Sequence, residues 1–237
     1  MPENNTSSST QRLNKYLAHH FGFSRREADE MIARGEVKIN DQVAPIGARL
    51  NEDSRVTVND KAVKELSGFT YIAFNKPRGY VCSRKQQGDR PTIYSILPIE
   101  YKNLKPVGRL DADSSGLILL TDDGDFTFTM THPKFVKQKT YLVMLDTDLQ
   151  PLHHQMINDY GIQLDDGTSK LSLERLHEGN SKSWTVRMSE GRNRQIRRTF
   201  SALGYTVVKL HRTEFGSFQL GNLARGETQV LSINPSA

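Results

Sequence analysis

The chain has 237 residues, with 32 Lys and Arg residues against 27 Asp and Glu residues, which gives a formal charge of +5. This length predicts one large domain or two modest ones, and the single cysteine, Cys82, excludes a disulfide framework within the chain and a cysteine-rich zinc site. The polar N-terminus lacks the apolar core of a secretory signal, and no apolar run approaches the ~20 residues that span a bilayer. We therefore expect a cytoplasmic protein with no membrane partner.

The N-terminal part of the chain predicts a short helix and then a second, capped helix. Residues 1–10 are rich in Ser, Thr and Asn, and we expect a disordered tail there. Leu13, Tyr16, Leu17 and Phe21 recur at helical spacing. Residues 24–27, Ser-Arg-Arg-Glu, form the pattern of a capping box, in which the serine hydroxyl and the glutamate carboxylate each bind a free backbone amide. We expect this second helix to end at Gly35.

After Gly35 the apolar spacing changes from the period of a helix to that of a strand. Residues 37–39 predict one strand, Asn40-Asp41 a tight turn and Val43 the start of the returning strand, while residues 55–58 predict another strand. The apolar pattern pauses at residues 64–68, where we place a domain boundary. Residues 11–68 thus form a predicted first domain, and residues 69–237 a second.

The second domain is predicted to consist mainly of strands. Strands are expected at residues 69–74, 117–121, 141–145, 184–188, 206–210 and 228–233. Helices are expected at residues 152–158 and 194–203, the latter with Ile196, Phe200 and Leu203 on its core face and Gly204 as its stop. The predicted class is α+β, with a large mixed and mostly antiparallel sheet flanked by helices.

Positive charge is concentrated in a few places, which is more informative than the mild net charge. The densest cluster is the run at residues 192–198, Arg-Asn-Arg-Gln-Ile-Arg-Arg. Arg194 and Arg198 are four residues apart and are expected to share one exposed stripe of the helix. Dense positive charge at a helix N-terminus opposes the helix dipole, so the run favours a bound anion such as an RNA phosphate. A solvated basic face is the alternative.

Several kinds of chemistry lack their usual sequence signals. The chain contains neither a G-x-x-x-x-G-K-[ST] loop nor a G-x-G-x-x-G turn, so we expect no nucleotide cofactor. The pairs His19-His20 and His153-His154 have no further ligands at metal spacing. Cys82 has no identifiable base nearby and is expected to be a small buried residue.

Asp111 follows Arg109 in a polar loop that leads into a very apolar stretch at residues 117–121. This places a carboxylate at the edge of a sheet, as a catalytic group or as an ordinary turn-forming aspartate. The residues from Asp111 to Asp122 also match part of an EF-hand calcium loop. Two features argue against a calcium site. Position 12 of the loop is Asp122 and not Glu, and no helix is predicted before or after the loop.

Four motifs in the second domain occur in one order along the chain, and together they resemble the RsuA-like branch of the bacterial ribosomal RNA pseudouridine synthases. They are Lys76-Pro77-x-Gly79, Gly108-Arg109-Leu110-Asp111, Lys139-Thr140-Tyr141 and the run Glu190–Arg198. The first domain resembles an S4-type RNA-binding domain, including its helix start at residues 24–28.

The resemblance implies an isomerase that converts a specific uridine of ribosomal RNA to pseudouridine after flipping the base out, without a cofactor or a metal. It implies Asp111 as the catalytic carboxylate, Tyr141 as the residue stacked on the base and Arg197 as the basic partner of Asp111, with Ile196 on the other side of the base. The residues expected to bind RNA are Arg109, Arg192, Asn193, Arg194, Arg198 and Lys76 in the second domain and Arg12, Lys15, Arg25, Arg26 and Lys38 in the first.

Two other functions remain open from the sequence. The chemistry could act on transfer RNA, or the chain could be a non-catalytic RNA-binding or ribosome-assembly factor. The joint presence of Asp111, Tyr141 and Arg197 favours an enzyme. The sequence of the arginine run at residues 192–198 favours large-subunit (23S) over small-subunit (16S) RNA as the substrate. A monomer is expected.

Overall fold

The computed structural model describes residues 11–21, 23–62, 68–86 and 88–233. The tail predicted at residues 1–10 and most of the boundary predicted at 64–68 lie outside the described residues. The chain forms two compact units, and the division between them falls between Phe69 and Thr70.

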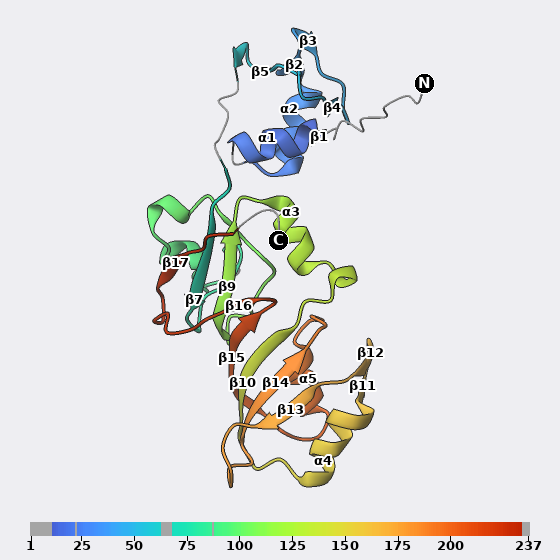
Figure 1. The fold of residues 1–237 in the computed structure, drawn as a ribbon, viewed down its shortest axis with the longest axis vertical. Helices are drawn as coiled ribbons and strands as arrows, with labels where there is room; N and C mark the ends of the chain where they lie inside the picture. The colour runs from blue at the N-terminus through green and yellow to red at the C-terminus, as the bar shows by residue number, and fades with distance from the viewer. Residues whose placement is uncertain (1–10, 22, 63–67, 87, 234–237) are drawn as a thin grey trace, which may run out of the picture. The chain divides into compact units, whose positions relative to one another are not determined.

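In its described residues, the first unit contains two helices and two small sheets, which can be followed in Figure 1. Helix α2 begins with the predicted capping box: the Ser24 hydroxyl accepts from the Glu27 amide, and the Glu27 carboxylate accepts from the Ser24 amide. The predicted hairpin turn is also present, because Asn40 and Asp41 both have positive φ. The elements are α1 Leu13–Phe21, α2 Arg25–Ala33, the pair β1 Gln11–Arg12 and β4 Arg49–Leu50, and a sheet in the order β3 Gln42–Val43, β2 Val37–Ile39, β5 Val56–Val58 and β6 Lys61–Ala62.

The core of this unit lies between the helices and the strands. Leu13, Leu17 and Ala28 are fully buried there, together with Val37. Phe21, the last member of the predicted apolar stripe, is 38% exposed, because α1 ends at this residue. The helical spacing was therefore predicted correctly, but the buried stripe is one turn shorter than expected.

The second unit is built on one nine-stranded sheet. The central order is β13-β14-β10-β15-β9-β7-β17, with β16 beside β15 and β8 beside β9. Among the strand pairs of this sheet in the described residues, only β9–β15 is parallel, so the sheet is mixed and mostly antiparallel, as predicted. The strands are β7 Tyr71–Lys76, β8 Lys105–Pro106, β9 Ser115–Thr121, β10 Lys139–Leu145, β13 Ser172–Arg175, β14 Ser183–Met188, β15 Val207–Phe215, β16 Phe218–Gln219 and β17 Thr228–Val230.

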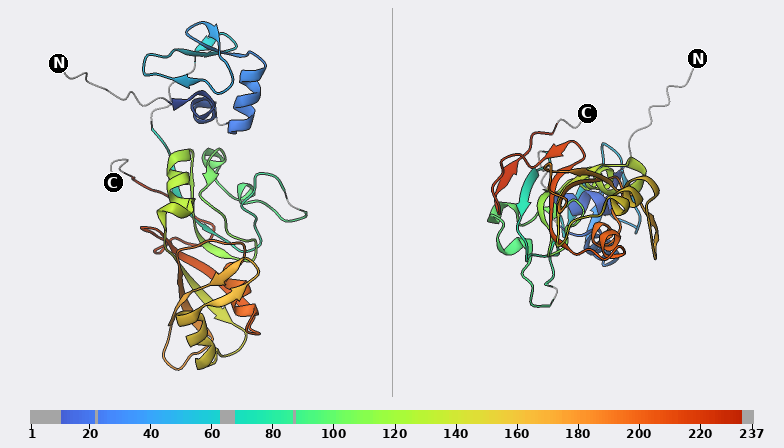
Figure 2. Two further views of the ribbon diagram at one scale, coloured as in Figure 1. Left: turned by 90° about the vertical axis from the view of Figure 1, so that its right-hand side faces the viewer. Right: turned by 90° about the horizontal axis from the view of Figure 1, so that it is seen from below.

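Helices and a hairpin flank this sheet. Both Figure 1 and the left view of Figure 2 place α4 and α5 at the β13-β14-β10 end of the unit, away from β7 and β17. The predicted helices at 152–158 and 194–203 correspond to α4 with its π-helical continuation and to the shorter α5. The elements are α3 Gly124–Thr131, α4 Pro151–Gln155, η4 Met156–Tyr160, α5 Gln195–Ser201, the hairpin β11 Ile162–Leu164 and β12 Gly167–Ser169, and the short 3-10 turns η1 Ile93–Ser95, η2 Ile99–Tyr101 and η3 Pro133–Phe135.

Helix α3 is a correction, because no helix was predicted to follow the loop from Asp111 to Asp122. Asp123 caps the helix, and its carboxylate accepts from the amides of Asp125 and Phe126. Alternating Phe and Thr residues gave this segment the look of a strand, but the cap and the packing of Phe126 and Met130 stabilise the helix. Among the described residues, no helix has the length and apolar character needed to cross a membrane.

The parallel pairing of β9 with β15 positions the Asp111 loop. Gly116 pairs with Arg212, and a Cβ atom at Gly116 would lie 2.2 Å from the Arg212 carbonyl oxygen. Its φ of +105° is also in the region that favours glycine. The two backbones therefore approach closely at the start of β9, and the residues just before this strand lie beside β15.

Candidate active site

The loop that carries Asp111 is held from beneath by a buried lysine. Lys76 is fully buried at the end of β7, and its Nζ donates to the carbonyl oxygens of Asp111, Ser114 and Pro77, at 3.1, 2.8 and 3.0 Å. Burial lowers the pKa of this ammonium. The expectation that Lys76 binds RNA is not supported by this geometry, because its charged end points into the protein and fixes the backbone of the loop.

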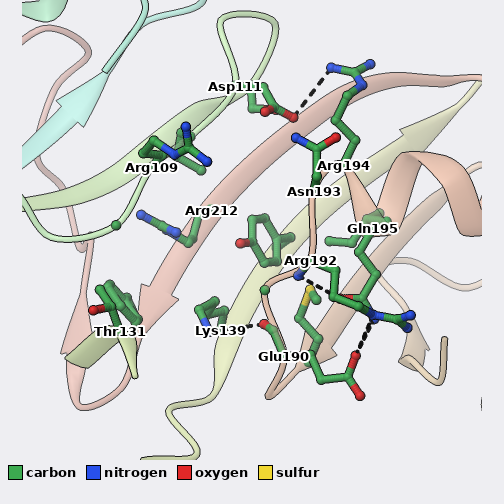
Figure 3. A pocket seen from close by; sticks show the side chains of 18 of the residues that line it. Arg109, Asp111, Thr131, Lys139, Glu190, Arg192, Asn193, Arg194, Gln195 and Arg212 are labelled. Carbon is green, nitrogen blue, oxygen red and sulfur yellow. Dashed lines mark hydrogen bonds and ion pairs between the residues drawn. The ribbon is translucent and has the colours of Figure 1, made fainter. Parts of the chain in front are cut away.

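Arg194 is the arginine that faces Asp111. Its Nη1 lies 3.4 Å from Oδ2 of Asp111, and its two terminal nitrogens donate to the two carboxylate oxygens of Asp113, each at 3.2 Å. Arg194 adopts a left-handed conformation, with φ of 47°, at the N-cap of α5. Such strain in a non-glycine residue persists only where the surrounding contacts impose it. Figure 3 shows the Arg194 and Asp111 side chains pointing toward each other.

The two aspartates of this cluster are exposed to a similar degree and share Arg194 as a partner. Side-chain exposure is 35% for Asp111 and 36% for Asp113, so both carboxylates are partly open to solvent. Burial raises the pKa of Asp113, but the hydrogen bond from Arg194 and the charges of Arg197 and Arg194 outweigh it, so that the pKa is lowered. The carboxylates therefore form one charge cluster with these arginines.

Arg197 supports the loop from behind instead of pairing with Asp111. Its Nε lies 3.3 Å from Oδ2 of Asp113, and its terminal nitrogens donate to the carbonyl oxygens of Val207 and Asp113, at 2.7 and 3.0 Å. The Arg197 side chain is 12% exposed and does not line the cavity described next. This corrects the expected pairing: the ion pair of Asp111 is with Arg194, since α5 begins only after that residue.

Asp111, Tyr141 and Ile196 line one open cavity of about 1230 Å³. They come from the loop before β9, from β10 and from α5, so the fold brings together three distant parts of the chain. Tyr141 and Ile196 are 8% and 4% exposed. The volume is above the ~300–1,000 Å³ of typical small-ligand pockets, which suits a substrate longer than one nucleotide. Arg109 and Asn193 are exposed at the cavity.

Arg192 and Arg198 are engaged within the protein. Arg192 donates to the Asp166 carboxylate and to the carbonyl oxygens of Gly167 and Thr168 in the β11–β12 hairpin. Arg198 donates to the other oxygen of Asp166, at 2.6 Å. The expectation that these two side chains bind phosphates is not supported by this geometry, because their charges already meet Asp166.

The residues of the first unit that were expected to bind RNA also differ from one another. Arg12, Arg25 and Arg26 are exposed, whereas Lys15 is half-buried. Lys38 donates to Asp60 at 2.6 Å, so its charge already meets a carboxylate.

The sequence analysis gave no role to four cations that line the cavity, and Lys139 and Arg212 are the two of them that lie in strands of the large sheet. Lys139 belongs to the Lys-Thr-Tyr motif, where only the tyrosine was given a role. Arg212 lies in β15, which extends five residues beyond the strand predicted to end at Leu210. This strand contains several polar residues, so the sequence carried no clear signal for Arg212.

The carboxylates of the possible calcium loop, residues 111–122, contact protein groups in this structure. Asp111 and Asp113 meet Arg194, and the Asp122 carboxylate accepts from the Thr70 amide at 2.8 Å. The carboxylates are thus occupied by protein groups. Within the part of the chain that the structure describes, no three His, Cys, Asp or Glu side chains gather in a way that could hold a metal ion.

Comparisons with known proteins agree with this geometry. A family model described as RNA pseudouridylate synthase matches residues 70–202, and a model of the S4 domain matches residues 11–52. The "Ribosomal small subunit pseudouridine synthase A" of Pasteurella multocida (strain Pm70) is 37% identical over 95% of this chain and 98% of its own. The "Ribosomal large subunit pseudouridine synthase B" of Bacillus subtilis (strain 168) is 34% identical over 94% of this chain and 92% of its own.

A solved structure also matches over nearly the whole chain. The crystal structure of a pseudouridylate synthase has a TM-score of 0.66 and 32% identity, and the match covers 94% of this chain and 96% of that one. The resemblance inferred from the four motifs is therefore confirmed. The chain belongs to the RNA pseudouridylate synthase family and carries an N-terminal S4 domain.

Proposed function

We propose that this pseudouridine synthase modifies a uridine in folded ribosomal RNA, with residues 11–68 binding RNA and residues 69–237 carrying out the reaction. The names of the relatives support ribosomal RNA as the substrate, since they refer to the small and the large ribosomal subunit. Exposed arginines on the first unit and at the cavity of the second suit this substrate, because structured RNA is read through its shape and its splayed-out bases.

The observation that carries the proposal is the cavity shared by Asp111, Tyr141, Ile196 and Arg194. A base inside a stack is out of reach of these side chains, so the target uridine has to be flipped into the cavity. Tyr141 and Ile196, both buried but open to the cavity, then contact the uracil, with the tyrosine ring stacked on it.

Asp111 acts at the ribose in this proposal, as a nucleophile or as a base. The bond between N1 of uracil and the ribose breaks, the base rotates, and a bond from C5 replaces it, while the proton of C5 is lost and one is gained at N1. Tyr141 is positioned to move the proton at C5. The net reaction is an isomerisation, so it requires neither a redox cofactor nor a phosphate donor.

The arginines have separate tasks. Arg194 orients the Asp111 carboxylate and balances its charge across 3.4 Å. Arg197 acts as a positioning residue, because it binds the backbone of Asp113 and not the reacting carboxylate. Arg109 and Asn193, exposed at the cavity, are placed to contact RNA that surrounds the flipped nucleotide.

The test is to map pseudouridine in the ribosomal and transfer RNAs of cells that lack the gene. We expect one ribosomal RNA position to lose its pseudouridine and to regain it when the gene is restored. The arginine run at 192–198 is the feature for which we propose large-subunit RNA, and both ribosomal RNAs are mapped. Loss of pseudouridine from transfer RNA alone would contradict the ribosomal substrate, and an unchanged map of all these RNAs would contradict the proposal as a whole.

A further inference from the structure

Two of the cations that line the active-site cavity, Arg212 and Lys139, lie away from Asp111, and the proposed reaction gives neither of them a task. Arg212 lies in β15 and Lys139 in β10, and the backbone of Arg212 pairs with that of Tyr141 in the sheet. Figure 3 shows Arg109, Arg212 and Lys139 following one another down one side of the pocket. Because both new residues are held by paired strands, their positions are set by the sheet.

Arg212 is a buried charge that is only partly satisfied. The side chain is 2% exposed, its Nε donates to the Leu117 carbonyl oxygen at 2.8 Å, and its Nη2 has no hydrogen-bond partner. The guanidinium lies 4.9 Å from the centre of the Phe215 ring. A buried guanidinium that lacks a counter-ion is costly, unless an anion joins it when the substrate binds.

Lys139 adds a second positive charge beside the first. Its Nζ donates to the carbonyl oxygens of Lys137 and Glu190, at 3.2 and 3.1 Å, and lies 5.5 Å from the centre of the same Phe215 ring. Burial and the charge of Arg212 lower the pKa of Lys139, which reflects the closeness of two like charges.

The nearby carboxylates are turned to other partners. Glu190 accepts from Arg192 and Gln195 through its side chain, and Glu214 accepts from the Thr140 hydroxyl at 2.6 Å. The ion pairs found in the described part of the second unit involve Arg187, Arg192, Arg194, Arg197 and Arg198, and neither Lys139 nor Arg212. Neither cation therefore has a carboxylate as ion-pair partner among the described residues.

We propose that Arg212 and Lys139 bind a backbone phosphate of the RNA next to the target uridine. Uracil is neutral when it enters, whereas each phosphate of the RNA carries a permanent charge, and the planar guanidinium fits phosphate oxygens well. The cavity of about 1230 Å³ has room for the flipped nucleotide and a neighbouring phosphate together. This inference rests on the proposed function, because it assumes that RNA enters this cavity.

The test uses an RNA fragment that contains the mapped uridine, with an uncharged methylphosphonate replacing the phosphate at one linkage at a time. In the wild type, we expect substitution of one linkage beside the target to raise KM about tenfold, the size of one charged hydrogen bond. Lys139→Met raises KM on the unmodified RNA by a similar factor, with kcat nearly unchanged. The same methylphosphonate then adds little further in this variant, because the contact is already lost.

The control is Lys102→Met, which removes an exposed lysine outside the cavity. It is expected to keep the wild-type KM and the wild-type sensitivity to each linkage. Arg212→Gln should become insensitive at the same linkage as Lys139→Met. Because Arg212 is buried, the melting temperature of the Arg212→Gln variant is also measured. If this variant does not fold, the test rests on Lys139→Met.

The inference is overturned if Lys139→Met leaves KM unchanged, if it lowers kcat alone, or if its effect multiplies with that of methylphosphonate at every linkage near the target. Turnover of the unmodified RNA by the wild type is measured in the same series. A wild type that forms no pseudouridine in this RNA would contradict the proposed function, whereas turnover with multiplicative effects would contradict the phosphate subsite alone.

Discussion

The Nη1 atom of Arg194 lies 3.4 Å from Oδ2 of Asp111, although 83 residues separate the two in the chain. We predict that Arg194→Gly lowers kcat about ten- to hundredfold, the equivalent of about 1.4–2.8 kcal/mol for one charge-assisted contact. Glycine is chosen because Arg194 has a positive φ, which glycine adopts without strain. Single-turnover kinetics on the mapped RNA measure the effect.

The melting temperature provides the control for this variant. Arg194→Gly removes the ion pair but also relieves the backbone strain, so we expect a melting temperature close to that of the wild type. A variant with wild-type kcat would exclude Arg194 from the reaction. If the variant is inactive and its melting temperature is much lower than that of the wild type, the loss of activity results from unfolding.

The buried ammonium of Lys76 is predicted to stabilise the active-site loop. Lys76→Met removes a donor from three carbonyl oxygens, of which that of Asp111 keeps the Ser114 amide as a partner. We expect a cost of about 3 kcal/mol, since each buried polar group left unpaired costs ~1–3 kcal/mol and removal of the buried charge offsets part of the loss. Denaturant unfolding of the full chain measures the change. A free energy of unfolding equal to that of the wild type would contradict the assigned role.

The stability of the second unit should depend on pH through Asp113. The folded state lowers the pKa of this carboxyl from its ordinary 3.8, so its contribution is complete above that value and is lost as the pH falls through the lower, folded value. Asp113→Asn is therefore expected to melt about 1–3 °C below the wild type at pH 7, the range for a half-exposed ion pair. The difference should shrink as the pH falls below about 4. A difference that grows in acid would have the wrong sign.

RNA binding by the first unit is predicted to depend on salt through Arg25 and Arg26. Both are exposed at the start of α2, where phosphates can reach them. The double variant Arg25→Ala, Arg26→Ala should weaken binding and make the slope of log affinity against log salt shallower by about 1 for each lost phosphate contact. Arg34→Ala is the matched control, because Arg34 already binds Glu36. Equal slopes for the double variant and the wild type would show that the RNA does not contact Arg25 or Arg26.

Much of the fold could be predicted because local signals determine it. The capping box at Ser24 and the turn at Asn40 each depend on neighbouring residues, so their sequences suffice. Helix α3 was missed because its Phe and Thr residues alternate as in a strand, while the cap at Asp123 and tertiary packing decide its structure. Local propensity and tertiary packing disagree at this segment, and the packing prevails.

The active site likewise combines features that the sequence predicts with features that only the tertiary structure determines. The four motifs identified Asp111, Tyr141 and Ile196, which do line one cavity. The motifs could not show which arginine meets Asp111, because this depends on where α5 begins and on the left-handed backbone of Arg194. Nor could they show that Lys76 points inward, since its partners are backbone carbonyls that pattern reading does not place.

Replacement of Asp111 by asparagine tests the central claim most directly, because it keeps the size of the side chain and removes the reactive carboxylate. Cells that lack the gene are complemented with the wild type or with Asp111→Asn, and pseudouridine is mapped in their ribosomal RNA. We predict that the wild type restores the missing pseudouridine and that Asp111→Asn does not, although the purified variant still binds the RNA. Full restoration by Asp111→Asn would contradict the account.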